Sequence, residues 1–279
     1  MTPAVFPCHP AVARPRHTPA SGWIQCPECG SLLRMVAGPA PAYDEEYARR
    51  RHHHEASVGE CKARSLERWL DRLSIRPQNE TVCEIGFGGG WCLQWLQDRG
   101  SFVMGLEPVL ANRDHAAALG IPPERLFDVV SLPALPRQPT LWLFQDSFEH
   151  VKDPGALVRW MASESSPEGA RVLLVAPDAQ AWSRRLMGRF WLHNVPDHWI
   201  HYSRRGVEDI FGREGFRVTR RFRPVKCVIP AIAFAHAGLV LAHAKRLRPL
   251  RLPAWRLWVN MGEMGLLLER HADRRETAA

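Results

Sequence analysis

The sequence predicts an α/β fold, in which a parallel β-sheet carries helices on both of its faces. From residue 81 onward, short apolar stretches alternate with stretches whose apolar residues recur at helical spacing. A glycine-rich turn at residues 84–90 joins the first apolar stretch to a helix. Strands that alternate with helices are typical of a parallel sheet, because each crossover connection places a helix on one face.

The elements are expected in the following order. Residues 43–54 are charged and predicted to be helical, and residues 57–74 form an amphipathic helix whose apolar positions include Leu66, Trp69 and Leu70. Strands are predicted over 81–86, 101–106, 125–130, 140–145 and 171–176, with helices over 91–99, 110–119 and 154–163. A helix over 204–213, a strand over 216–222 and a last strand over 264–270 complete the fold.

Two parts of unequal size are predicted. Residues 1–22 are rich in proline, alanine and arginine and predict a disordered tail, because they cannot bury enough apolar surface to offset their ordering entropy. A compact element over 23–43 completes an N-terminal appendage, 1–43. Residues 44–279 form the large domain, which carries an apolar and basic insertion at about 226–258.

The glycine-rich turn indicates a nucleotide-type cofactor. Gly86, Gly88 and Gly90 allow a tight turn and a close approach of the backbone, and the following helix offers free N–H groups. A dinucleotide site would require a third glycine at the position of Trp91. With Glu84 before the turn and no glycine at position 91, the pattern favours S-adenosylmethionine.

Three acidic residues are expected to contact that cofactor. Glu84 is predicted to meet the amino-acid end, directly or through water. Glu107 ends the second strand and lies 23 residues after Glu84, at the place where a carboxylate can accept both ribose hydroxyls. Asp128, after the third strand, is predicted to reach the adenine amino group.

The chain resembles the class I S-adenosylmethionine-dependent methyltransferases, in particular the ubiquinone-biosynthesis-type and related small-molecule enzymes. The resemblance covers about residues 61–224 and returns at 262–270. The segments that carry it are 82–90, 105–108, 145–154, 175–178, 197–203 and 215–218. It departs from the family in the proline-rich stretch 131–136 and at Thr140, where an aspartate usually opens the fourth strand.

The resemblance implies a Rossmann-like sheet with an antiparallel last strand and methyl transfer to a small molecule. Oxygen is the favoured acceptor, and carbon and nitrogen acceptors remain open. It also implies that the Glu149-His150 pair and the segment that contains His198 border the substrate pocket. Asp146 is expected to contact the cofactor, with the capping of a turn as the alternative.

Two histidines are the candidate catalytic residues. Methyl transfer is a displacement that requires alignment and, for a hydroxyl acceptor, a base; histidine suits that role because its ordinary pKa lies near neutrality. His150 and His198 are the candidates, with His201 behind them. The alternatives are that His150 only bonds the backbone and that His198 is a structural hinge.

A single C-x-x-C pair, Cys26 and Cys29, is half of the ligand set of a zinc ribbon. Cys8, Cys61 and the histidines at 52–54 could complete it, but none lies at a standard spacing. The sequence therefore favours a degenerate remnant over an occupied zinc site.

The charge pattern leaves the partners open. The net charge is +8 and the pI about 9.5, which favours anionic partners. No RNA-binding module is recognisable, so nucleic acid is not the expected partner. Residues 228–244 carry no charge and are followed by a basic stretch up to Arg251. This pattern suits either a helix on an anionic membrane surface, with a lipid-linked or isoprenoid substrate, or a buried helix.

No secretory signal is recognisable, and the seven cysteines form no regular framework. A cytoplasmic and in part membrane-associated protein is expected, and the oligomeric state is open. Two alternatives to a small-molecule methyltransferase remain: a nucleic-acid-modifying or nucleic-acid-binding protein, and a catalytically silent partner with the same fold.

Overall fold

The computed structural model describes residues 6–10, 16–17, 22–35, 44–50, 53–163, 166–195, 197–230 and 255–271. Its centre is a seven-stranded sheet in the order β10-β13-β8-β7-β4-β5-β6. These strands are β4 (Thr81–Ile85), β5 (Phe102–Leu106), β6 (Leu126–Phe127), β7 (Leu141–Gln145), β8 (Arg171–Pro177), β10 (Phe216–Phe222) and β13 (Glu263–Arg270). β4 to β8 run parallel, whereas β13 is antiparallel to both of its neighbours, β8 and β10. The predicted fold class, including the antiparallel last strand, is confirmed.

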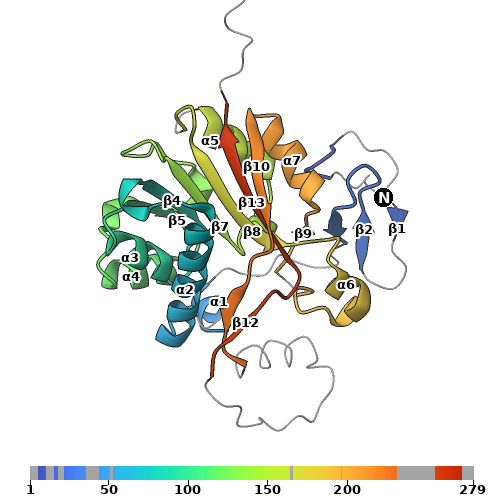
Figure 1. Ribbon diagram of the computed structural model, residues 1–279, viewed down its shortest axis with the longest axis horizontal. Coiled ribbons are helices and arrows are strands. Elements are labelled where there is room, and N and C mark those ends of the chain that lie inside the picture. The colour runs from blue at the N-terminus through green and yellow to red at the C-terminus, as the bar shows by residue number, and fades with distance from the viewer. Residues whose placement is uncertain are drawn as a thin grey trace, which may run out of the picture.

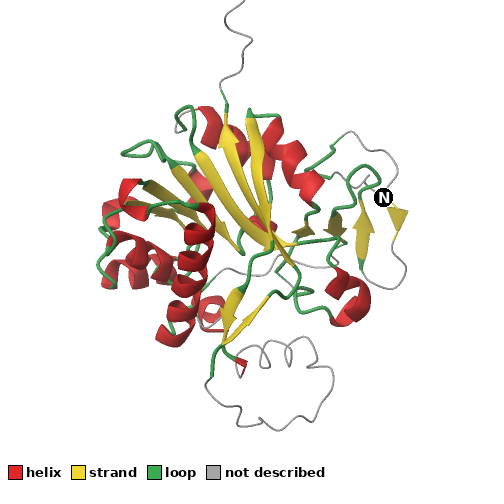
Figure 2. Ribbon diagram, viewed as in Figure 1, coloured by secondary structure: helices red, strands yellow, loops and turns green. Residues whose placement is uncertain are grey.

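Helices cover both faces of the sheet (Figures 1 and 2). α2 (Ala56–Leu73), α3 (Trp91–Gln97) and α4 (Leu110–Ala118) pack on one face, and α5 (Pro154–Ser163) and α7 (Arg204–Gly212) on the other. The short α1 (Glu45–Arg50) contacts α4, and α6 (Trp182–Met187) follows β8. Single 3-10 turns lie at Pro77–Asn79, Pro123–Arg125, Val129–Ser131, Phe148–His150 and Gly188–Phe190.

Each central strand supplies side chains to two cores. In β4, Val82 joins the core under α2 and α3, while its neighbour Cys83 joins the core under α5 and α7. This alternation follows from the period of two along a strand. Since both faces are covered, every residue of β7 is buried, which is why the sequence shows continuous apolar stretches here.

The N-terminal appendage forms a separate sheet in the order β1-β2-β3-β9. Three of its strands precede the large domain: β1 (Arg16–His17), β2 (Trp23–Gln25) and β3 (Leu32–Arg34). The fourth strand, β9 (Ile200–His201), is part of the large domain. Part of the predicted disordered tail is ordered: Phe6 and Cys8 are both 0% exposed. Composition alone predicted disorder there, because the apolar partners of these two side chains lie far away in the sequence.

Two differences from the predicted elements have local causes. The strand predicted over 125–130 is only β6, because Asp128 accepts a hydrogen bond from the Val130 backbone N at 2.9 Å and turns the chain into a 3-10 turn. Four further elements were not predicted, because they are too short to show a period: α6, β9 and the pair β11 (Lys226–Val228) and β12 (Leu257–Val259).

The predicted insertion begins and ends in this antiparallel pair, in which Cys227 lies opposite Trp258. The predicted membrane-surface contact through 228–251 falls almost wholly outside the described residues. Among the residues that the structure does describe, no helix has the length and apolar character needed to cross a bilayer.

Candidate active site

The glycine-rich turn between β4 and α3 holds three glycines in the left-handed region. Gly86, Gly88 and Gly90 have φ values of 72°, 56° and 82°. At Gly86 a Cβ would lie 2.5 Å from the Cβ of Ser147, so no larger residue fits. Gly90 serves helix packing instead, because its missing Cβ would lie 2.5 Å from that of Ala116 in α4.

A cavity of about 460 Å³ lies beside this turn, and we call it the glycine-loop cavity. Its lining includes Gly86, Gly88, Glu107, Val129, Leu132 and Leu157. It lies at the carboxyl ends of β4, β5 and β7, where open parallel sheets bind their ligands. The bare backbone on one side and the apolar walls on the other fit a ligand that contains a nucleoside.

Glu107 lines this cavity with a buried carboxylate that is already oriented by the backbone. Its Oε2 accepts a hydrogen bond from the Gly88 N at 2.9 Å, and its Oε1 accepts from the Val109 N at 3.2 Å and the Asn112 Nδ2 at 3.1 Å. Burial raises the pKa of Glu107, and these donors oppose the rise. The carboxylate is thus held at the wall of the cavity, as a group that accepts hydrogen bonds from a ribose would have to be.

Glu84 is buried at the end of β4, and burial raises its pKa to about 8. Its Oε2 has no hydrogen-bond partner among the described residues. The nearby Lys62 lowers the pKa and the Glu107 carboxylate raises it, both less than burial does. Glu84 does not line the glycine-loop cavity directly, so a contact with a ligand there would pass through water or Lys62.

Asp128 lies outside the set of residues that line the cavity. Besides accepting from Val130, its carboxylate lies 3.7 Å from the Arg113 guanidinium. The apolar side chains of Val129, Val130 and Leu132 line the cavity at this point instead.

A second cavity, of about 270 Å³, adjoins the first, and we call it the histidine cavity. Its polar lining includes Glu149, His150, His193, His198 and Lys226, and its apolar lining includes Val58, Leu192, Val195, Ile229 and Met261. The cavity therefore combines titratable groups with walls suited to an apolar molecule.

The predicted histidines meet in this cavity. The rings of His150 and His198 make an edge contact, with centroids 4.7 Å apart. His150 Nδ1 lies 2.8 Å from the carbonyl oxygen of Asp197. Since a carbonyl only accepts, Nδ1 carries the proton, and Nε2 is the ring atom that can accept one.

His198 lies between two protein groups. Its Nε2 lies 3.8 Å from the Glu149 Oε1, and its Nδ1 lies 3.3 Å from the His201 Nε2. Burial, and after it the Asp146 carboxylate, raises the pKa of Glu149 well above its ordinary range. Burial lowers the pKa of His201 well below its ordinary range, so this ring stays neutral.

Asp146 and Lys226 form the polar wall between the cavities. Asp146 has a φ of 53°, and its two oxygens lie 2.5 and 2.6 Å from the Lys226 Nζ. The Glu263 Oε1 lies 3.0 Å from the same Nζ. Burial alone would lower the pKa of Lys226, but the two carboxylates outweigh burial and raise it.

The two cavities share six lining residues: Tyr47, His53, Lys62, Gln145, Asp146 and His150. Of the predicted site residues, Gly86, Gly88, Glu107, Asp146, His150 and His198 therefore lie in one continuous site. Glu84, Gly90 and Asp128 flank it.

Tyr47 and His53, which no sequence motif indicated as site residues, cover the site at this junction. The Trp91 Nε1 donates to the His53 carbonyl oxygen at 2.8 Å. A Cβ on Gly89 would lie 2.0 Å from that same oxygen. Trp91 thus has a structural role, because its indole holds the His53 backbone in place. Position 89 must be glycine because the His53 carbonyl oxygen occupies the space that a side chain would need.

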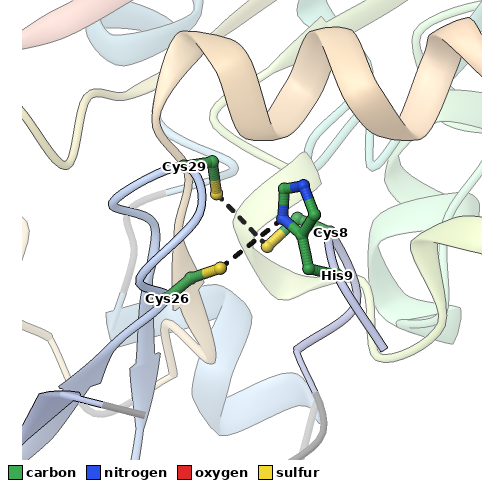
Figure 3. Close-up of side chains that lie close together, drawn as sticks. All are labelled: Cys8, His9, Cys26 and Cys29. Atoms are coloured by element: carbon green, nitrogen blue, oxygen red, sulfur yellow. Dashed lines mark hydrogen bonds between the residues drawn. The ribbon is translucent and has the colours of Figure 1, made fainter. Parts of the chain in front are cut away.

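The predicted metal pair is joined by two residues from the start of the chain. Cys8, His9, Cys26 and Cys29 lie together in the N-terminal appendage (Figure 3). Cys8 was one of the completions considered, whereas His9 was not. The other completions are elsewhere: Cys61 lines the histidine cavity, and His53 and His54 lie beside the glycine-rich turn.

The strand order, the glycine cradle and the buried carboxylate after β5 define a Rossmann-like protein that binds S-adenosylmethionine and transfers its methyl group. The chain belongs to the methyltransferase-domain family, whose sequence profile matches residues 51–221. No curated protein matches the chain.

Solved structures share this fold at low sequence identity. A chain in the complex of the Trm112 methyltransferase activator from Haloferax volcanii is 15% identical, with a TM-score of 0.57 over 83% of this chain and 97% of that one. The YcgJ protein of Bacillus subtilis is 14% identical, with a TM-score of 0.53 over 75% and 99%. An S-adenosylmethionine-dependent methyltransferase from Thermotoga maritima is 15% identical, with a TM-score of 0.50 over 81% and 95%.

Proposed function

We propose that this methyltransferase methylates an oxygen atom of a small molecule bound in the histidine cavity. The observation that carries the proposal is the position of His150, which lines both cavities. A group at that junction can act on an acceptor in one cavity while the methyl donor occupies the other.

The residues of the glycine-loop cavity fit the donor. Gly86 and Gly88 present bare backbone, Glu107 would accept the ribose hydroxyls, and Glu84 with its unpaired oxygen would meet the amino-acid end through water. S-adenosylmethionine supplies a methyl group on a positively charged sulfur, which makes the displacement favourable without further activation of the donor.

His150 would act as the base. Its Nδ1 proton is held by the Asp197 carbonyl, so Nε2 takes the proton of the acceptor hydroxyl as the new oxygen–carbon bond forms. A neutral amine can attack through its lone pair without first losing a proton, whereas a hydroxyl gains nucleophilicity from a base, and a base at this place therefore favours oxygen over nitrogen.

His198 is proposed as a positioning residue. Both of its ring nitrogens face protein groups, Glu149 and His201, and its edge contact fixes the plane of the His150 ring. The neighbours of the two histidines thus favour His150 as the base and His198 as the residue that positions it.

The apolar walls indicate the kind of acceptor. Val58, Leu192 and Met261 line the histidine cavity together with Ile229, which belongs to the insertion at about 226–258. A hydroxylated aromatic or isoprenoid compound, free or linked to a lipid, would place its apolar part against these side chains.

The test is a screen of hydroxylated and aminated aromatic acceptors, read by release of S-adenosylhomocysteine, followed by His150→Ala. We expect kcat with a hydroxyl acceptor to fall by about 10²–10⁴-fold. Calorimetry with S-adenosylhomocysteine should give an unchanged dissociation constant, which separates loss of the base from loss of the cofactor.

His198→Ala is the matched variant and should lower kcat less than His150→Ala does, because the base remains and only its orientation is lost. Turnover of amines alone would contradict an oxygen acceptor, and an unchanged kcat in His150→Ala would contradict the assignment of the base.

A further inference from the structure

Four metal-ligating side chains converge in the N-terminal appendage, outside both cavities. Cys8, Cys26 and Cys29 are 0%, 1% and 4% exposed, and the His9 side chain beside them is 20% exposed. They come from two segments, the loop 6–10 and the turn between β2 and β3 (Figure 3). One ligand atom of each lies within 4.8 Å of all the others.

The distances match those of a tetrahedral zinc site. With Zn–S near 2.3 Å and Zn–N near 2.0–2.1 Å, two sulfur ligands lie roughly 3.8 Å apart, and a sulfur and a nitrogen roughly 3.5 Å. The Cys8 and Cys29 sulfurs are 3.5 Å apart, and the Cys26 sulfur is 3.5 Å from the His9 Nδ1. All seven cysteines are free thiols.

The surroundings of His9 support the same reading. An Asp209 carboxylate oxygen of α7 lies 3.1 Å from the His9 Nε2. A carboxylate at that nitrogen holds the proton there and leaves Nδ1 as the metal ligand, an arrangement common around zinc-bound histidines. The chain thus provides four ligands and one orienting group.

The turn that carries two of the ligands is closed by the backbone. The Gly30 N donates to the Cys26 carbonyl oxygen at 2.9 Å, and the Cys26 N donates to the Ser31 carbonyl oxygen at 2.8 Å. Gly30 has a φ of 81°, which a larger residue rarely adopts. This turn brings the Cys26 and Cys29 sulfurs to the same side.

The appendage also holds β9, the strand whose His201 contacts His198 of the histidine cavity. β3 pairs with β9, with Leu32 opposite His201. The Ser203 N donates to the Ser31 Oγ at 2.9 Å, and the rings of Trp23 and His201 stack with centroids 4.2 Å apart. His201 in turn contacts His198.

We propose that Cys8, His9, Cys26 and Cys29 bind one zinc ion, and that this zinc fixes β9 and the adjoining His198 at the histidine cavity. Three thiolates and one imidazole are a ligand set that zinc prefers. The metal has a structural role, because four protein ligands leave no open position. The zinc site stands on its own, whereas its effect on the acceptor rests on the proposed function.

The first test is the metal content of the untagged full-length protein. We expect about one zinc per chain, lost in Cys26→Ser and Cys29→Ser and retained in Cys61→Ser. Cobalt added to the metal-free wild type should give thiolate charge-transfer and tetrahedral ligand-field bands, and His9→Ala should shift them. The wild-type cobalt spectrum keeps the test decisive even if a cysteine variant fails to fold.

Three results would overturn the proposal: wild-type protein that binds neither zinc nor cobalt, a Cys8–Cys29 disulfide in the mass spectrum of the native protein, or zinc retained in both cysteine variants. Hydrogen exchange then tests the second part without an acceptor. Removal of zinc should accelerate exchange at residues 198–203 and leave β4 unchanged.

The affinity for S-adenosylhomocysteine should change by less than about twofold on zinc removal, because none of the appendage residues that the structure describes lines the glycine-loop cavity. Unchanged exchange at 198–203 would contradict the link to the histidine cavity. Since neither readout uses turnover, failure of the zinc site is distinguishable from a wrong acceptor.

Discussion

Two buried glutamates, Glu84 in β4 and Glu107 directly after β5, lie near the glycine-rich turn, and their surroundings differ. Glu107 accepts hydrogen bonds from two backbone N–H groups and an asparagine, whereas the Glu84 Oε2 has no such donor among the described residues. Burial raises the pKa of both, that of Glu84 to about 8. Glu84 is thus largely protonated at neutral pH in the free protein, and its charge should respond to a cation nearby.

We predict that cofactor binding releases a proton from Glu84. The ammonium of the ligand's amino-acid end favours the carboxylate and lowers its pKa, so affinity should rise with pH up to about 8 and then level off. Calorimetry of S-adenosylhomocysteine binding at pH 7 in buffers of different ionisation enthalpy should show close to one proton released. Equal proton release in Glu84→Gln would contradict this assignment.

The same raised pKa has a consequence for stability. The contribution of Glu84 is fully present below its ordinary pKa of 4.5 and is lost as pH rises through about 8. In the free protein, Glu84→Gln should therefore flatten the decline of the free energy of unfolding between these two pH values, measured by urea denaturation.

For Glu107 we predict a loss of cofactor affinity. In Glu107→Gln the amide oxygen can still accept from Gly88, but one ribose hydroxyl loses a charged acceptor. That loss is worth roughly 1.5–3 kcal/mol, or about 10–150-fold in the dissociation constant for S-adenosylhomocysteine. Asp114→Asn, an exposed change in α4, should leave the affinity unchanged. An equal loss of affinity in Asp114→Asn would show that the effect of Glu107→Gln is not specific to the ribose contact.

At the scale of elements, Lys226 connects three strands. It opens β11, and its Nζ lies between Asp146 at the end of β7 and Glu263 at the start of β13. The ammonium is itself buried, with a side-chain exposure of 9%. The pair β11–β12 is thereby fixed to the carboxyl edge of the main sheet, beside the histidine cavity.

We predict that Lys226→Met lowers the free energy of unfolding by about 3–5 kcal/mol, because it leaves two carboxylates without their shared cation. The matched control is Glu67→Gln, which removes the exposed ion pair with Arg99 at 3.3 Å and should change stability by less than about 1 kcal/mol. Chemical denaturation measures both. A loss in Lys226→Met no larger than in the control would show that the buried cation contributes little.

At the scale of the whole molecule, the cofactor site is closed by a segment that precedes the sheet in sequence. Tyr47 and His53 line both cavities, and the Trp91 indole holds the His53 carbonyl. The His54 ring stacks on that of His115 in α4, with centroids 4.2 Å apart. Binding of the cofactor should therefore order this covering segment as well as the glycine-rich turn.

We predict that S-adenosylhomocysteine slows hydrogen exchange at residues 45–58 and that Trp91→Phe weakens its binding about fivefold, the equivalent of one hydrogen bond of about 1 kcal/mol. The phenyl ring keeps the packing on Gly59 but cannot donate to His53. Trp95→Phe on the same helix is the control and should bind normally. Unchanged exchange at 45–58 would mean that the segment does not respond to the ligand.

The sequence by itself determined the sheet, its covering helices and the cofactor side of the site, because these are local features. The strand, glycine-rich turn and helix at 81–97 lie within one continuous stretch, and Glu107 follows the next strand. Apolar periodicity gives the limits of such elements directly, and the glycines report a backbone conformation that only they adopt readily.

Only the tertiary structure decided what lies around that core. His53 meets Gly89, Lys226 meets Asp146, and Cys8 with His9 meets the turn at Cys26 and Cys29. Each of these contacts joins segments that are distant in the sequence. The residues involved are single polar side chains in short or irregular elements, so no periodic pattern in the sequence indicates them. Their partners are chosen by the packing of the whole chain, as Gly90 illustrates, since its missing Cβ makes room for Ala116 of α4.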